Sequence, residues 1–119
     1  MAMPIRLFHN PRCSKSREAL ALLREHGVEP QVVEYLKQPP SAAQIDRLLT
    51  LLGMQPRQLM RRGEAVYKEL GLDDPGLSRA ALIEAMASQP ILIERPIAMR
   101  GERAVLGRPP EKVLELLGA

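Results

Sequence analysis

The chain has 119 residues, of which 45% are hydrophobic and 26% are charged, and its formal net charge is +3. This length and composition exclude a disordered polypeptide and fit one globular domain that buries its own core. Aromatic residues make up only 3% of the chain, so we expect no surface that stacks nucleic-acid bases. The basic residues are scattered along the chain, which favours small anions over nucleic acid as partners.

A single cysteine and two histidines bound the chemistry that the chain can carry. One cysteine cannot form an intramolecular disulfide, which favours a reducing compartment. One cysteine with two histidines does not make a credible zinc set. The N-terminal residues lack the apolar segment of a signal peptide, and no run approaches the ~18 apolar residues of a membrane span. We therefore expect a cytoplasmic protein with no metal, no membrane contact and no nucleic-acid partner.

The first third of the chain has the pattern of a parallel β-α-β unit. Residues 4–8 alternate like a short strand, which ends at the turn residues His9-Asn10-Pro11. Apolar residues then recur at helical spacing over about 14–26, and Gly27 is well placed to stop that helix. The β-branched stretch 30–36 predicts a second strand. Because the two strands are joined through a helix, we expect them to pair in parallel.

The block at about 41–88 carries only helical patterns. Ser41, with Gln44 three residues later, is a capping-box signature at the start of a helix. Residues 56–70 predict one or two shorter helices, and Ser78 is placed to cap a further one. This block therefore reads as a helical insertion, not as a separate domain.

The last third has the pattern of a hairpin followed by a helix. Two short runs, 96–99 and 104–106, are separated by a tight turn, and a helix is expected to begin at Pro110. The full order is β-α-β, helical insertion, β-β-α. We predict an α/β protein with a thioredoxin-like fold and a mixed central sheet, formed as a single domain over 1–119 with a helical insertion at about 41–88.

Cys13 is the candidate nucleophile. It lies where a strand ends and a helix begins, among free backbone N–H groups and the positive end of the helix dipole, both of which favour a thiolate. A buried cysteine acting as a small hydrophobe is the alternative, but Arg12, Lys15 and Arg17 are the wrong neighbours for a core. The spacing to Ser16 is C-x-x-S, so an oxidised Cys13 must be reduced by an external thiol.

Three arginines and one histidine are candidates for the same site. Arginine is usually solvated surface, but Arg95 and Arg108 flank the two sides of the predicted hairpin. In such a fold, the residue before the hairpin proline lies beside the cysteine turn. Guanidinium groups grip tetrahedral oxyanions with two hydrogen bonds, and Arg61 is a third candidate. His9 either supports the thiolate or its turn, or is a strand-end histidine that is satisfied locally.

Five stretches together resemble one protein family over nearly the whole chain. The family is that of the glutaredoxin-linked arsenate reductases, and Cys13-Ser14-Lys15-Ser16 places the chain close to a branch of uncharacterised relatives. The motifs that carry the resemblance are His9-Asn10-Pro11-Arg12-Cys13, Tyr35-Leu36 with Pro39-Pro40, Leu59-Met60-Arg61 with Tyr67-Lys68-Glu69-Leu70-Gly71, Pro90-Ile91-Leu92-Ile93-Glu94-Arg95-Pro96-Ile97, and Gly107-Arg108-Pro109 with Val113-Leu114-Glu115.

The resemblance implies a mechanism and a set of site residues. The fold would be thioredoxin-like, and the cysteine would attack arsenate to form a thiolate–arsenate adduct. Glutathione as co-substrate and then glutaredoxin as protein partner would complete the reduction to arsenite, with no bound cofactor. The implied roles are nucleophile for Cys13, oxyanion binding for Arg61, Arg95 and Arg108, thiolate tuning for His9 and Ser16, and a cis peptide bond before Pro96.

A second function of a different class stays open. The same fold could serve as a non-enzymatic regulator or binding protein that docks on a larger partner, with Cys13 as a redox sensor or relic. A related branch of transcriptional regulators carries C-x-x-C, and Ser16 argues against that redox switch. An enzyme needs its arginines to converge on Cys13, whereas a docking protein needs an exposed apolar or charged face.

Overall fold

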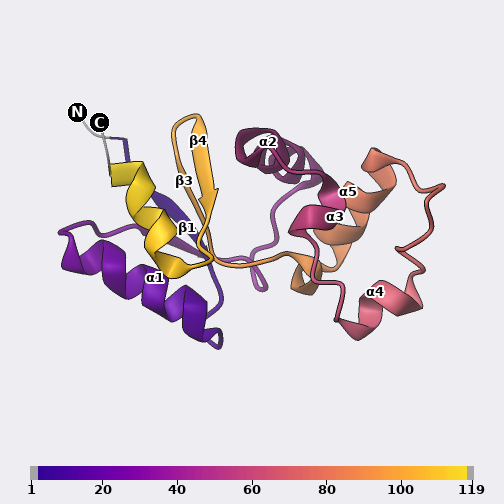
Figure 1. The fold of residues 1–119 in the computed structure, drawn as a ribbon, viewed down its shortest axis with the longest axis horizontal. Helices are drawn as coiled ribbons and strands as arrows, with labels where there is room; N and C mark the ends of the chain where they lie inside the picture. Colours follow the sequence, from indigo (N-terminus) through magenta and orange to yellow (C-terminus); the bar gives the residue numbers. More distant parts are fainter. Residues whose placement is uncertain (1–2, 118–119) are drawn as a thin grey trace. The chain divides into compact units, whose positions relative to one another are not determined.

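The computed structural model describes residues 3–117 and divides them into two compact units (Figure 1). The first comprises the described residues of Met1–Gln38 and Arg95–Ala119, and we call it the thiol unit because it contains Cys13. The second, Pro39–Glu94, we call the helical unit. Each unit is considered by itself below.

The thiol unit is built on a four-stranded mixed sheet with the strand order β2-β1-β3-β4. Strand β1 pairs in parallel with β2 and antiparallel with β3, and β3 pairs antiparallel with β4. The elements of this unit are β1 (Arg6–His9), α1 (Ser14–Glu25), β2 (Gln31–Glu34), β3 (Ile97–Arg100), β4 (Arg103–Leu106) and the 3-10 helix η2 (Pro110–Leu117).

The register of the sheet puts one row of side chains on the face that the helices cover. Leu7 of β1 pairs with Ala98 of β3, and both are fully buried, whereas Val32, the partner of Leu7 on β2, is 39% exposed. The hairpin between β3 and β4 turns at Gly101, whose φ of 60° is readily adopted only by glycine. The sheet thus brings the N-terminal strand beside a hairpin from the far end of the sequence.

Helices α1 and η2 pack side by side on that face, as the purple and yellow helices of Figure 1 show. Ala19 and Leu23 of α1 and Val113 and Leu116 of η2 have no exposed surface. The core cluster of this unit is made of Ile5, Leu7, Ala19, Leu23, Ala98, Val113 and Leu116. Burial of this apolar stripe holds α1 against the sheet, so the first turn of α1 is fixed where β1 ends.

The helical unit is assembled from short helices with well-formed caps. Ser41 and Gln44 form the predicted capping box, and Ser78 accepts a hydrogen bond from the backbone N–H of Ala81. Gly53 ends α2 in the left-handed conformation. The elements are α2 (Ala42–Leu52), α3 (Pro56–Leu59), α4 (Ala65–Glu69), α5 (Arg79–Ser88) and the 3-10 helix η1 (Pro90–Leu92).

The core of the helical unit lies where α2, α3 and η1 contact α5. Met60 and Ile93 form an isolated antiparallel bridge, and the backbone N–H of Arg61 donates to the carbonyl of Leu92 at 2.7 Å. This bridge ties the segment after α3 to the segment after α5. The position of Arg61 within the unit is therefore fixed by its backbone.

The predicted fold class is confirmed: the element order and the mixed sheet are those of a thioredoxin-like fold with a helical insertion. The first two strands are shorter than predicted, 6–9 instead of 4–8 and 31–34 instead of 30–36, whereas the hairpin strands are 97–100 instead of 96–99 and 103–106 instead of 104–106. The last helix is a 3-10 helix, whose Glu115 and Leu116 carbonyls accept hydrogen bonds from Arg103 and Arg100. The insertion predicted at about 41–88 falls within Pro39–Glu94, and the single domain over 1–119 stays a prediction.

One further property concerns membranes. Within residues 3–117, no helix combines the length and the apolar character that crossing a bilayer requires.

Candidate active site around Cys13

Cys13 is the N-cap residue of α1. Its backbone is extended, with φ −97° and ψ 122°, and its carbonyl accepts the first helical hydrogen bond, from the N–H of Arg17 at 3.0 Å. Its own N–H donates to the carbonyl of Asn10 at 3.0 Å, which closes a turn between β1 and α1. The thiol thereby meets the backbone N–H groups of Lys15 and Ser16 in the first turn of the helix.

This position changes the acidity of the thiol. Burial by itself would raise the pKa of Cys13. Burial is the largest single effect, but the N–H of Ser16, the guanidinium of Arg95 and the N–H of Lys15 favour the negatively charged sulfur and together outweigh it. The pKa of Cys13 therefore lies below its ordinary value, as expected for a thiol at a helix N-terminus beside a cation.

Arg95 and Arg108 reach Cys13 from the hairpin at the other end of the chain. Nη2 of Arg108 lies 3.9 Å from Sγ of Cys13, and Nε of Arg108 donates to the Arg95 carbonyl at 2.8 Å. The Arg95–Pro96 peptide bond is cis. The N–H of Gly107 donates to the Pro96 carbonyl at 2.8 Å, and a Cβ at position 107 would meet Pro96 Cγ at 2.8 Å. The two arginine-bearing loops are thus in close contact.

Arg95 offers a donor that the described residues leave unused. Its Nε is buried, and no acceptor among residues 3–117 bonds it. A buried guanidinium N–H without an acceptor is costly unless something else binds it. The unused donor lies beside a thiolate and a helix N-terminus, both of which suit an incoming tetrahedral anion.

His9 and Ser16 form a buried pair behind the thiol. His9 Nδ1 and Ser16 Oγ are 2.6 Å apart, and the backbone N–H of Asn10 donates to Ser16 Oγ at 3.0 Å. Burial is the main cause that lowers the pKa of His9, with Glu34 opposing it. A neutral His9 with Nδ1 unprotonated can accept a hydrogen bond from the Ser16 hydroxyl, whose oxygen already accepts one from the Asn10 N–H. Ser16 therefore acts on Cys13 through its backbone N–H, and its side chain ties β1 to α1.

Arg61 lies in the helical unit, within an intra-unit ion pair. Its Nε is 3.9 Å from Oε2 of Glu64, a distance too long for a hydrogen bond, and both side chains are one-quarter exposed. Nε is buried and has no hydrogen-bond acceptor among residues 3–117. That Arg61 shares an oxyanion site with Cys13 stays a prediction.

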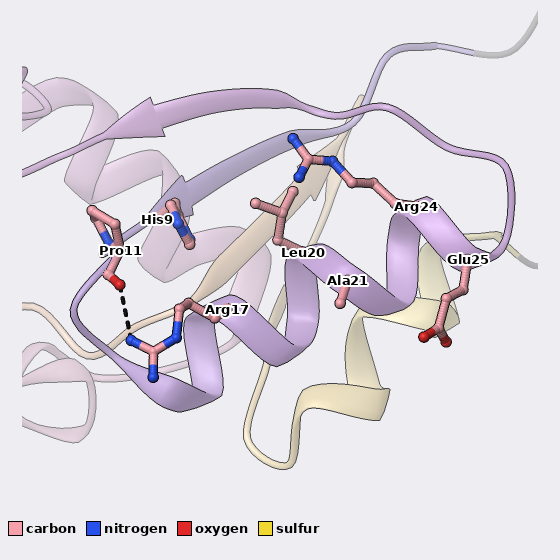
Figure 2. Close-up of a pocket in the computed structure, with 7 residues that line it drawn as sticks. All are labelled: His9, Pro11, Arg17, Leu20, Ala21, Arg24 and Glu25. Atoms are coloured by element: carbon pink, nitrogen blue, oxygen red, sulfur yellow. Dashed lines mark hydrogen bonds between the residues drawn. The ribbon is translucent and has the colours of Figure 1, made fainter.

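A groove of about 500 Å³ runs along α1 away from the cysteine turn (Figure 2). Arg17 lies at one end, where Nη1 donates to the Pro11 carbonyl at 2.9 Å. Arg24 lies further along the helix and pairs with Glu29. The groove is lined by His9, Pro11, Arg17, Leu20, Ala21, Arg24 and Glu25. The contact of Arg17 with the turn was not predicted, although its place one helical turn after Cys13 could have suggested it.

The groups that meet at Cys13 are a thiol, two guanidiniums and backbone N–H groups, which together suit an anion. Among residues 3–117, no three His, Cys, Asp or Glu side chains are grouped so that they could hold a metal ion.

Comparison with known proteins places this arrangement in a family. The model of the ArsC family matches residues 8–116, which include Cys13, Arg95 and Arg108. The chain belongs to the ArsC family. This confirms the family resemblance that the motifs indicated, while the assignment to the Cys-Ser-Lys-Ser branch stays a prediction.

Proteins similar to this chain cover nearly its whole length. The uncharacterized protein YfgD of Escherichia coli K12 is 55% identical over 99% of this chain and 100% of its own length. An arsenate reductase of Neisseria meningitidis serogroup A is 46% identical over 95% of this chain and 97% of its own. Among solved structures, an arsenate reductase from Vibrio cholerae has a TM-score of 0.93 and 51% identity, covering 98% of this chain and 99% of the other.

Proposed function

We propose that this protein is an oxidoreductase that reduces arsenate to arsenite, with glutathione and a glutaredoxin supplying the electrons. The observation that carries the proposal is the approach of Arg95 and Arg108 to a Cys13 thiol of lowered pKa at the start of α1. The relatives named arsenate reductase, at 46% and 51% identity, support the choice of oxyanion.

In the first proposed step, the Cys13 thiolate attacks the arsenic atom of arsenate. A sulfur–arsenic bond forms, one arsenic–oxygen bond breaks, and the departing oxygen leaves as water after it takes up protons. Arg95 and Arg108 bind the remaining oxygens, together with the N-terminal N–H groups of α1. Arg61 of the helical unit is the proposed third cation for the oxyanion and its reduced product.

In the second proposed step, a glutathione thiolate attacks the Cys13 sulfur. A disulfide forms between Cys13 and glutathione, and the electron pair of the sulfur–arsenic bond passes to arsenic, which leaves as arsenite. A glutaredoxin thiol then exchanges with this disulfide and releases the Cys13 thiol. Two thiols are oxidised for each arsenic that gains two electrons, so the step balances.

His9 and Ser16 have a supporting role in the proposal. Their hydrogen bond holds the first turn of α1 against the end of β1, and the N–H of Ser16 stabilises the thiolate. The reaction consumes reduced thiols, which a reducing compartment maintains. We therefore propose that the protein works in the cytoplasm.

The test is arsenate-dependent oxidation of NADPH in the presence of glutathione, glutathione reductase and glutaredoxin. We expect turnover by the native protein and none by Cys13→Ser, because serine cannot form the adduct. Omitting glutaredoxin while glutathione is kept tests whether glutaredoxin is needed, because glutathione reductase couples NADPH only to oxidised glutathione. An absence of turnover by native protein whose Cys13 still reacts with iodoacetamide would overturn arsenate as substrate, which is also the result expected of a docking regulator.

A further inference from the structure

The turn that presents Cys13 has a defined type. Asn10 and Cys13 are its first and fourth residues, joined by the Cys13 N–H to Asn10 carbonyl bond of 3.0 Å. Pro11 and Arg12 occupy the two central positions. A type II turn needs a positive φ at the third residue, and among residues 3–117 only glycines have a positive φ. The turn is therefore of the type I class, which favours asparagine at the first position and proline at the second.

Both ends of the central peptide of this turn are held by side chains. The N–H of Arg12 donates to Oδ1 of Asn10 at 3.0 Å. The carbonyl of Pro11, on the other side of the same peptide, accepts from Nη1 of Arg17 at 2.9 Å, the dashed line of Figure 2. Rotation of this peptide distinguishes the two common turn types. That rotation would break both hydrogen bonds.

The same peptide sets the direction in which the chain enters Cys13. The backbone N–H of Arg17 already holds the Cys13 carbonyl at 3.0 Å, so Arg17 holds backbone on both sides of Arg12. A tilt of the Pro11–Arg12 peptide would move Cys13 relative to the N–H groups of Lys15 and Ser16. Stabilisation of a thiolate by such groups depends steeply on hydrogen-bond geometry.

We propose that Arg17 and Asn10 are positioning residues for the Cys13 thiol, which lock the Pro11–Arg12 peptide from its two ends. Neither side chain needs to touch a substrate for this role. The consequence for turnover rests on the function proposed above, but the positioning itself is a property of the free thiol and can be measured without arsenate.

The competing explanation is that Arg17 acts only as a nearby positive charge. Arg12 provides the matched control, because it is a cation directly next to Cys13 and is exposed. Substituting Arg12 by alanine removes a charge but keeps the backbone N–H that Asn10 binds. An effect of charge alone should therefore appear in Arg12→Ala as well as in Arg17→Ala.

The experiment measures the rate of Cys13 alkylation by iodoacetamide as a function of pH, since only the thiolate reacts. In Arg17→Ala and Asn10→Ala, we expect the titration to shift to higher pH and the rate near neutral pH to fall by roughly threefold to tenfold, the range for one lost hydrogen bond. In Arg12→Ala, the alkylation rate should fall less. Arg17→Lys, which keeps a donor for the Pro11 carbonyl, should recover part of the loss. Thermal unfolding midpoints close to that of the native protein would show that the variants fold.

A double-mutant cycle supplies the decisive comparison. If both side chains lock one peptide, the second substitution adds less than the first, and the effects in Asn10→Ala/Arg17→Ala are not additive. Additive effects, or a loss in Arg12→Ala as large as in Arg17→Ala, would overturn the proposal. A protein that fails to turn over arsenate but shows the coupled alkylation defect would refute the proposed substrate and leave the positioning role standing.

Discussion

The two units differ in the longest stretch of chain that their arginine contacts span. In the helical unit, Arg57 donates to the Leu72 carbonyl, 15 residues away, and Arg79 pairs with Asp46, 33 residues away. In the thiol unit, Arg108 reaches Cys13 across 95 residues and Arg100 reaches the Met3 carbonyl across 97. The longest of these contacts in the helical unit thus spans 33 residues, whereas the thiol site exists only when two ends of the chain meet in one sheet.

This difference predicts that damage to the two cores will have different chemical consequences. Leu23 of the thiol unit and Leu49 of the helical unit both have no exposed surface. Replacing either by alanine should lower the free energy of unfolding by about 2 to 5 kcal/mol, measured in urea. Leu23→Ala should also slow alkylation of Cys13, because Leu23 holds α1 on the sheet, whereas Leu49→Ala should not. Equal effects of the two substitutions on the rate of Cys13 alkylation would contradict this difference between the units.

Substituting the arginines of the thiol unit should lower the rate of arsenate turnover. Arg95→Ala or Arg108→Ala should reduce kcat/KM for arsenate about tenfold to a hundredfold, the cost of a lost hydrogen bond to a charged group. Arg95→Ala should in addition raise the pKa of Cys13, because the Arg95 guanidinium lowers it in the native protein.

Two arginine variants of the helical unit should differ from these in their effects on kcat/KM and on the titration of Cys13. Arg61→Ala should reduce kcat/KM for arsenate while leaving the titration of the thiol unchanged. Arg79→Ala, which breaks only an exposed pair with Asp46, should change neither quantity. A shift of the Cys13 titration in Arg61→Ala would show that the units share more of the site than this contrast allows.

Substitutions at the helix caps test whether a loss of stability in the helical unit leaves the reactivity of Cys13 unchanged. Ser41→Ala and Ser78→Ala should each cost about 1 kcal/mol of stability, because each removes the acceptor for an N-terminal N–H group. Glycine at the same positions should cost only a few tenths of that. Chemical denaturation measures both, and the alkylation rate of Cys13 should not change in any of the four variants.

The smallest expected effect is a dependence of stability on pH that comes from His9. The pKa of His9 is lowered in the folded protein, mainly by burial. Between that value and the unfolded value of about 6.5, the unfolded chain binds more protons, so its contribution to stability is complete above about pH 6.5 and is lost as the pH falls. Urea unfolding at a series of pH values should show a weaker loss in His9→Gln. His26→Gln, at the other histidine of the chain, is the control variant.

The sequence predicted best what local chemistry decides. The caps at Ser41 and Ser78 are confirmed because a cap needs only a side chain and the N–H groups two or three residues later. The thioredoxin-like fold class is confirmed because the order of the elements leaves few ways to arrange them. Strand ends and the 3-10 form of η2 were missed, because they depend on sheet pairing and on the Arg100 and Arg103 contacts.

The contacts that make up the candidate site were harder to predict from the sequence than the helix caps were. Cys13 could be singled out from its flanking residues, but spacing alone does not show that Arg95 and Arg108 approach it, since that requires the folded sheet. The hydrogen bonds of Asn10 and Arg17 to the cysteine turn were missed for a different reason: they are short-range, but exposed polar side chains have many possible partners. The place of Arg61 in the site stays a prediction.

Gly107 has a consequence for selection experiments. A Cβ there would lie 2.8 Å from the ring of Pro96 and 3.1 Å from Val113 Cγ1, so every other amino acid must displace a rigid ring or a core side chain. A randomised library that aims to alter oxyanion preference through Arg95 and Arg108 would therefore recover only glycine at position 107. Natural variation should reach a new preference by changing the neighbouring side chains, not by remodelling the backbone that joins them.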